Sequence, residues 1–192
     1  MGYKLRVEVP GIYHVTTRGN NKRVIFLNDK DRLVFIRLLN RLATKHGWTI
    51  YAYVLMTNHY HLVMRIDERG MSRGLCELNS QYALLFNQMH ERVNHLFGKR
   101  YWSERIESDE RFRRACRYVV RNPVEAGLVE SPGDYVWSSY YQATVGIALG
   151  HVRVAVDELL AMFGPDRASA IESFRALCET PDPPGHVRWQ PP

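Results

Sequence analysis

The chain has few cysteines, and their spacing excludes several classes of protein. Cys76, Cys116 and Cys178 are odd in number and far apart, and none belongs to a C-x-x-C motif. This usage argues against a disulfide scaffold and against a thiolate zinc site, and it favours reduced thiols. We therefore expect a cytoplasmic protein.

Long hydrophobic runs and the common catalytic motifs are also missing. No apolar run approaches the roughly 20 residues that a membrane-spanning helix needs, and residues 1–10 do not form a signal peptide. These absences predict no membrane partner. The chain has no G-x-S-x-G elbow, Walker A loop, H-E-x-x-H motif or dinucleotide fingerprint. It also lacks the dense carboxylate cluster of two-metal nucleases, so any catalysis must use another set of residues.

The net charge of +6 is unevenly distributed along the 192 residues. Residues 1–150 carry 22 Lys and Arg against 14 Asp and Glu, whereas residues 151–192 carry four Arg against six acids. A basic N-terminal body favours a polyanionic partner, most often a nucleic acid. The length suits one well-buried domain, with or without an extension.

Hydrophobic periodicity and turn residues predict an α+β fold. Strands are expected at 11–19, 48–56, 59–66 and 100–106. Helices are expected at 29–45, 72–93 and 109–121. The short connection between the second and third strands makes them antiparallel neighbours. The resulting order, β-α-β-β-α-β-α, is that of a split βαβ sheet of the ferredoxin-like or RRM-like type, with helices packed on an antiparallel sheet.

The C-terminal part is expected to form an extension of the body. Trp137 is predicted to pack back on the sheet, and two short helices are predicted between residues 156 and 180. The tail over 181–192 is Pro-rich and is expected to be extended. We therefore predict a body over 1–142 and a helical extension over 143–192.

The stretch TNHYHLVMR (57–65) puts two imidazoles on one face of the third predicted strand. Successive strand side chains point to opposite faces, so His59 and His61 lie opposite the apolar side formed by Tyr60 and Leu62. One interpretation is a partly solvated pair on an open sheet face. The other is a metal site, because neutral imidazole is the commonest metal ligand. A metal site would need a third ligand from elsewhere.

Tyrosine is the abundant candidate nucleophile, with 11 copies. Tyr82 lies in an apolar stripe of the second predicted helix, which makes it a core residue. Tyr118 falls away from the apolar stripe of the third predicted helix, among Arg114 and Arg121. A phenol in a basic patch suits attack on a phosphate, since positive charge lowers its pKa from about 10 and binds the anion. The alternative is a surface tyrosine that covers the helix.

Asn122 follows Tyr118 by four residues, so the two side chains are neighbours if the last turn stays helical. Its amide oxygen could then supply the third metal ligand. Pro123 works against this arrangement, because the residue before a proline is pushed out of α geometry. The alternative is a simple helix-terminating Asn-Pro pair.

Five pieces of the sequence stand in the order of a known family. They are YHVTTRGNNKRVIF (13–26), YVLMTNHYHLVMR (53–65), FNQ (86–88), YVVRNPVEAGLV (118–129) and DYVWSSY (134–140). Together they resemble the single-tyrosine HUH transposases that act on single-stranded DNA, in particular the branch associated with repetitive extragenic palindromes. The resemblance covers most of residues 11–142 and says little about 143–192.

The resemblance implies a site and a reaction. His59 and His61 would be the metal pair, Asn122 the polar third ligand of Mg²⁺ or Mn²⁺, and Tyr118 the nucleophile. Tyr118 would cut hairpin-forming single-stranded DNA, leaving a 5′-phosphotyrosine that a DNA 3′-OH can resolve. The chain would work as a monomer or homodimer. The candidate phosphate contacts, each of which is alternatively ordinary surface charge, are Arg18, Lys22, Arg23, Arg114 and Arg121.

Two other functions also fit the sequence. A non-catalytic, RRM-like protein could stack bases on its sheet without cutting them. A metal-dependent hydrolase could act on small phosphoesters. A protein–DNA adduct that survives denaturation is expected only for the transposase-like enzyme.

Overall fold

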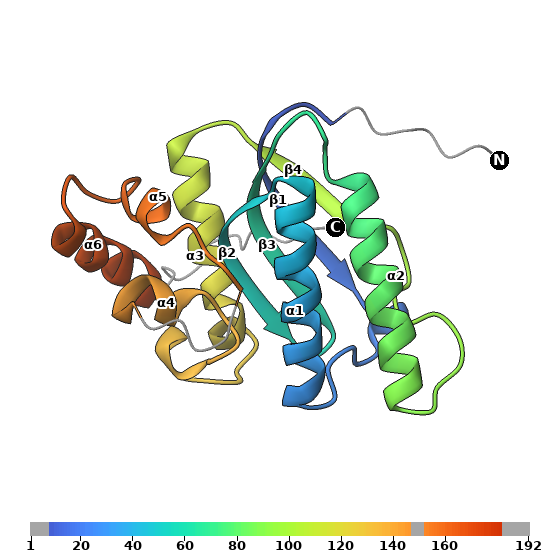
Figure 1. Cartoon of the computed structure of the whole chain (residues 1–192). Helices are drawn as coiled ribbons and strands as arrows, with labels where there is room; N and C mark the ends of the chain where they lie inside the picture. The colour runs from blue at the N-terminus through green and yellow to red at the C-terminus, as the bar shows by residue number, and fades with distance from the viewer. Residues whose placement is uncertain (1–7, 147–151, 182–192) are drawn as a thin grey trace.

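A four-stranded antiparallel sheet forms the centre of the molecule (Figure 1). The computed structural model describes residues 8–146 and 152–181. The strands are β1 (Gly11–Arg18), β2 (Thr49–Met56), β3 (His59–Ile66) and β4 (Trp102–Ile106). They pair in the order β2-β3-β1-β4. This order confirms the predicted α+β class with a split βαβ sheet.

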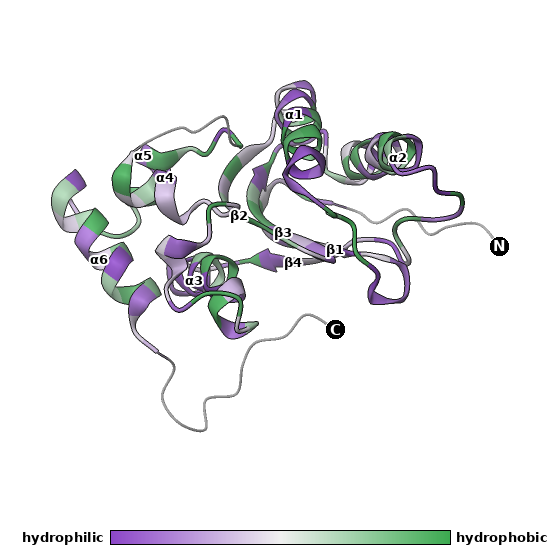
Figure 2. Ribbon diagram, turned by 90° about the horizontal axis from the view of Figure 1, so that it is seen from below, coloured by the Kyte–Doolittle hydropathy of each residue, from purple (hydrophilic) through white to green (hydrophobic). Residues whose placement is uncertain are grey.

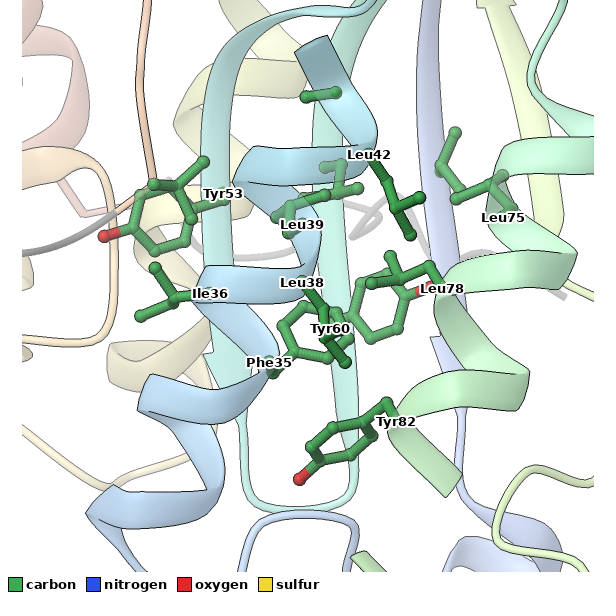
Figure 3. Packing of buried hydrophobic residues seen from close by; sticks show 14 of the residues in the cluster. Phe35, Ile36, Leu38, Leu39, Leu42, Tyr53, Tyr60, Leu75, Leu78 and Tyr82 are labelled. Atoms are coloured by element: carbon green, nitrogen blue, oxygen red, sulfur yellow. The ribbon is translucent and has the colours of Figure 1, made fainter. Parts of the chain in front are cut away.

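Two helices cover one face of the sheet and form the larger core. They are α1 (Asp29–His46) and α2 (Ser72–Met89). Figure 3 shows Phe35 and Leu39 of α1 and Leu78 of α2 pointing toward Tyr60 of the sheet. Tyr82 is fully buried in this cluster, as its place in the apolar stripe predicts.

A third helix, α3 (Asp109–Glu125), packs on the opposite face of the sheet. Figure 2 shows α1 and α2 on one side of the strands and α3 on the other. A second cluster joins Val54 and Val63 of the sheet to Cys116 and Val119 of α3. The interpretation of the histidine pair as lying on an open face is therefore wrong for His61, which is buried under α3, whereas His59 is half-buried.

The helix ends follow local hydrogen bonds. Asn28 is the N-cap of α1, and it forms a reciprocal capping box with Asp31. Gly47 ends α1 in the left-handed region, with φ +66°. The second helix ends at Met89, four residues before the predicted end, because His90 leaves helical geometry at its C-cap.

Pro123 lies inside α3 and does not end it. The helix continues to Glu125, and the amide of Ala126 donates to the carbonyl of Asn122 at 3.0 Å. The left-handed Gly127, with φ +68°, follows the last turn. Asn122 therefore keeps α geometry, contrary to the effect expected from its proline neighbour.

The C-terminal part packs against the sheet and α3. Its helices are α4 (Tyr140–Val145), α5 (Val156–Leu160) and α6 (Arg167–Glu179). The amide of Leu55 in β2 donates to the carbonyl of Trp137 at 2.9 Å, so the segment before α4 returns to the sheet as predicted. The expected division after residue 142 falls within α4 and stays an expectation, and the Pro-rich tail lies beyond the described residues from 182 onward. Within the described ranges, no helix combines the length and apolar character needed to cross a bilayer.

Candidate active site

Strand β3 and helix α3 bring four polar side chains together between the sheet and the helix. His59 and His61 both project from β3 toward α3, and their rings lie 4.9 Å apart and nearly perpendicular, at 88°. The ring of Tyr118 on α3 lies 5.5 Å from the ring of His61. Residues separated by more than fifty positions in the sequence thus share one small space.

Asn122 joins the two elements. Its Oδ1 lies 3.1 Å from Nε2 of His59. Its side chain also forms a hydrogen bond with the hydroxyl of Tyr118, four residues earlier on the same helix. The expected i, i+4 pair is present because α3 stays helical through Pro123.

One pair of the candidate donors has the spacing that a divalent ion needs. Two ligands that bind an octahedral ion at about 2.1 Å from adjacent positions lie about 3.0 Å apart, which is close to the separation of the His59 nitrogen and the Asn122 oxygen. Among residues 8–146 and 152–181, no three His, Cys, Asp or Glu side chains form a metal-binding group. The third ligand of the site would therefore be the amide oxygen of Asn122, beside the imidazoles of His59 and His61.

Burial keeps the imidazoles of this site neutral. Desolvation lowers the pKa of His59 to about 4, and the positive charge of Arg18 acts in the same direction. Desolvation also lowers the pKa of His61 well below 6.5, helped by His14 and His59. Neutral rings retain a nitrogen lone pair near neutral pH, and that lone pair is what a metal ion binds.

Tyr118 does not have the lowered pKa that its arginine neighbours in sequence predict. The side chain is half-buried, and desolvation raises the pKa of the phenol above 10. The hydrogen bond from Asn122 and the charge of Arg18 act in the opposite direction but are smaller effects. The expected depression is wrong because α3 turns Tyr118 toward the sheet and away from water.

Three of the candidate phosphate contacts lie at one end of the sheet. Arg18 ends β1 directly opposite His59 of β3 and is exposed. Lys22 and Arg23 follow in the exposed loop after β1, where the turn η1 (Asn20–Lys22) places Lys22 at φ +59°. A lysine in the left-handed region is uncommon, and such strained residues gather at functional sites.

The two candidates on α3 have different environments. Arg114 is exposed and forms a surface ion pair with Glu110. Arg121 is only 5% exposed, and its guanidinium donates to the carbonyl of Cys178 at 2.8 Å and to the carboxylate of Glu125. Its assignment as a phosphate contact is wrong, because α6 covers it and its donors are already used within the fold.

Two further residues of the site were missed in the sequence. Nε2 of His14 on β1 lies 3.0 Å from Nδ1 of His61, and the ring of His14 is 5.8 Å from that of Tyr118. Oδ1 of Asn58 lies 2.7 Å from Nδ1 of His59. Strand alternation could have found His14, since it shares a face of β1 with Arg18.

The chain matches a described protein family over more than half of its length. The matching family, Transposase IS200 like, covers residues 10–122. The chain belongs to the IS200-like transposase family. The matched region of this transposase includes His59, His61, Tyr118 and Asn122.

Two proteins similar to this chain carry the name of one branch of the family. A Haemophilus influenzae protein, provisionally named a REP-associated tyrosine transposase, is 21% identical over 136 residues, which are 62% of this chain and 77% of the relative. A solved structure of a REP-associated tyrosine transposase bound to a REP hairpin superposes with a TM-score of 0.64. That match has 19% identity and covers 81% of this chain and 93% of the other. The resemblance expected from the five sequence pieces is confirmed, and so is the fold.

Proposed function

We propose that this protein cuts and joins hairpin-forming single-stranded DNA through a covalent bond to Tyr118, with a divalent ion held by His59, His61 and Asn122. The observation that carries the proposal is the meeting of a phenol, two neutral imidazoles and an amide from β3 and α3. A strand and a helix must both be placed correctly to produce this cluster. A DNA hairpin is the expected partner, because the relative of known structure is bound to one.

Tyr118 is the residue that would form the covalent bond. Its Oη attacks the scissile phosphorus, the bond from phosphorus to the 3′ oxygen breaks, and that oxygen leaves as a 3′-OH. The phenol loses its proton as the bond forms, and the hydrogen bond with Asn122 orients the phenol oxygen. Attack by a DNA 3′-OH on the phosphotyrosine reverses these steps and joins two strands without an external energy source.

The divalent ion, Mg²⁺ or Mn²⁺, would polarise the scissile phosphate and stabilise the charge that develops on it. Imidazole and amide ligands suit Mn²⁺ at least as well as the oxygen-seeking Mg²⁺. The chain's own contribution would be three donors for one ion at a point between β3 and α3, namely His59 Nε2, Asn122 Oδ1 and the ring of His61. Burial between α3 and the sheet limits access of water to that point.

Exposed cations beside the site would bind the DNA backbone. Arg18 is near enough to influence the pKa of His59, His61 and Tyr118, so we expect this cation to contact the scissile phosphate. Lys22 and Arg23 follow in the exposed loop after β1, and Arg114 is an exposed cation on α3. Such contacts supply most of the sequence-independent affinity for nucleic acid.

The covered sheet favours an enzyme over an RRM-like binding protein. An RRM stacks bases on an exposed sheet face, whereas here α3 buries Val54 and Val63 on that face and α1 and α2 bury the other. This packing removes β2 and β3 from base stacking on that face and leaves β1 and β4 less covered. A small-phosphoester hydrolase needs no basic surface leading away from its site, and this chain has one.

Trapping the covalent intermediate tests the proposal. Incubation with hairpin-bearing single-stranded DNA and Mn²⁺ should give a protein–DNA adduct that survives boiling in detergent. Removal of the ion with EDTA should abolish the adduct while leaving most DNA binding in place, because binding rests on phosphate contacts elsewhere. Binding without an adduct under any metal condition would point to a non-catalytic protein, and turnover of small phosphoesters without an adduct would point to a hydrolase.

A further inference from the structure

Each of the two imidazoles assigned to the metal has its other nitrogen against a second polar residue. We infer that Asn58 and His14 are positioning residues that keep His59 and His61 protonated on Nδ1, so that Nε2 of both rings stays free for the ion. The inference rests on the proposed metal site and adds to it the two residues that fix the orientation of its ligands. Such partners commonly set the tautomer and ring angle of metal-binding histidines.

Asn58 has a defined orientation. Its Nδ2 donates to the carbonyl of Lys22 at 3.0 Å, so its Oδ1 must point the other way. That oxygen lies 2.7 Å from Nδ1 of His59 and is an acceptor only. Nδ1 of His59 therefore carries the proton, and Nε2 carries the lone pair.

The lone pair of His59 then faces a second acceptor. Nε2 lies 3.1 Å from Oδ1 of Asn122. This contact is within hydrogen-bond distance, and a neutral ring donates to only one of the two oxygens; the shorter contact, to Asn58 at 2.7 Å, assigns the proton to Nδ1. The orientation of Asn58 thus prepares the opposite nitrogen of His59 for metal binding before any metal arrives.

His14 lies against the same nitrogen of His61; either ring of this pair can donate, and the inference assigns the donor role to His61. Nε2 of His14 lies 3.0 Å from Nδ1 of His61, with the two rings stacked 5.1 Å apart. When His61 donates from Nδ1, its Nε2 is free on the side away from His14. The same contact occupies Nε2 of His14, which argues against His14 as another ligand through that nitrogen.

Asn58 also links the metal site to the basic loop. It lies in the turn between β2 and β3, and its carbonyl accepts from the amide of Gly19 at 2.8 Å. Its side chain holds Lys22, whose φ of +59° is unfavourable for a lysine. One side chain therefore fixes both a ligand orientation and the loop that presents Lys22 and Arg23.

Mn²⁺ affinity of the full-length chain, measured by electron paramagnetic resonance of the free ion without DNA, tests the inference. His14→Phe and Asn58→Leu remove the acceptors, and each should raise the Kd for Mn²⁺ about 10- to 100-fold. His14→Gln and Asn58→Asp restore an acceptor oxygen and should recover most of the affinity. His90→Gln is the matched control, because His90 pairs with Asp31 beside α1 and α2, and its Mn²⁺ affinity should equal that of the wild type.

The tautomers of His59 and His61 can be measured in the wild-type chain, so this test does not require any variant to fold. Nitrogen-15 NMR of the metal-free protein should show a protonated Nδ1 and a bare Nε2 in both His59 and His61. A proton on Nε2 of His61 would overturn the role of His14, and a proton on Nε2 of His59 would overturn that of Asn58. Unchanged Mn²⁺ affinity in folded His14→Phe and Asn58→Leu would do the same.

A His61→Ala variant separates this inference from the proposed function. If it binds Mn²⁺ as tightly as the wild type, the metal site is wrong and the proposed function fails with it. If it loses Mn²⁺ while the acceptor-free variants keep it, only the positioning role is wrong. Loss of affinity in all three, with recovery in His14→Gln and Asn58→Asp, supports both.

Discussion

The hydroxyl of Tyr118 is the group on which the proposed chemistry depends. Tyr118→Phe removes one oxygen and keeps the ring contact with His61. Cleavage and adduct formation should both vanish, because the nucleophile is gone. The free energy of unfolding should change by only about 1 kcal/mol, the value of one hydrogen bond, and affinity for single-stranded DNA should stay within a few-fold. Denaturant unfolding and cleavage assays measure the two effects.

Tyr82→Phe is the matched control for that substitution. The hydroxyl of Tyr82 is buried and donates to the carbonyl of Ile25 at 2.5 Å. Its loss leaves a buried acceptor unpaired and should lower the free energy of unfolding by about 1–3 kcal/mol. Cleavage should persist. An inactive but folded Tyr82→Phe, or an active Tyr118→Phe, contradicts the assignment of the nucleophile.

The two histidines of β3 should differ in their effect on stability. From the sequence, His59→Ala and His61→Ala are both expected to leave the fold intact, because both side chains point away from the apolar side of the strand. In the structure His61 is 1% exposed and contacts His14, whereas His59 is half-buried. His61→Ala should therefore lower the free energy of unfolding by about 1–3 kcal/mol through a cavity and a lost hydrogen bond, and His59→Ala by less.

Both histidine variants should lose cleavage and keep most of their affinity for single-stranded DNA. Urea titration, gel cleavage in Mn²⁺ and DNA binding measure the three quantities. Full cleavage by a folded His59→Ala or His61→Ala variant would show that the substituted histidine is not a required metal ligand.

The site residues that the sequence predicts belong to local patterns, whereas those that it misses depend on contacts between distant segments. His59 and His61 were found from strand alternation, and Tyr118 and Asn122 from helical spacing, because both are local patterns. His14 was not found, since its partner His61 is 47 residues away and depends on the register of β1 against β3. Asn58 lies in the short connection between the second and third strands, and no local pattern shows that its side chain contacts His59.

The apolar stripe of α3 predicts only one of the two sides on which this helix is packed. Its predicted apolar face meets the sheet as expected, through Phe112, Cys116 and Val119. The sequence gives no sign that α6 covers a second side of the same helix, so Arg121 was read as solvated. The carbonyls of Leu177 and Cys178 near the end of α6 accept from Arg117 and Arg121, which satisfies groups that a helix end leaves unpaired.

The sequence assigns the same role, a phosphate contact, to Arg121 and Arg114. In the structure we expect Arg121 to stabilise the fold and Arg114 to bind DNA. Arg121→Ala leaves Glu125 and the Cys178 carbonyl without their buried partner and should lower the free energy of unfolding by about 3 kcal/mol. DNA affinity of the folded fraction should be unchanged. Arg114→Ala, at an exposed position, should leave stability within about 0.5 kcal/mol and weaken binding to single-stranded DNA in a salt-dependent way.

Unfolding curves and DNA titrations at two salt concentrations decide between these expectations. If Arg121→Ala is fully stable and binds DNA poorly, the docking of α6 on α3 is wrong and the original assignment of Arg121 returns.

The molecule as a whole is three-layered, and this arrangement creates the site. The element order alone predicted the sheet and its class, because periodicity and short connections restrict the possible topologies. It did not predict that α3 and the C-terminal helices bury the second face. That burial is what makes His59 and His61 neutral and raises the pKa of Tyr118, while the exposed Arg18 is close enough to act on all three.

Peptide mapping of the trapped protein–DNA adduct tests the central claim most directly. The adduct formed with hairpin-bearing single-stranded DNA and Mn²⁺ is digested, and the modified peptide is identified by mass spectrometry. The account predicts a single phosphotyrosyl linkage at Tyr118, carrying the 5′ end of the cleaved strand. DNA attached at Tyr82, Tyr101 or Tyr140, or at any residue other than Tyr118, would contradict it.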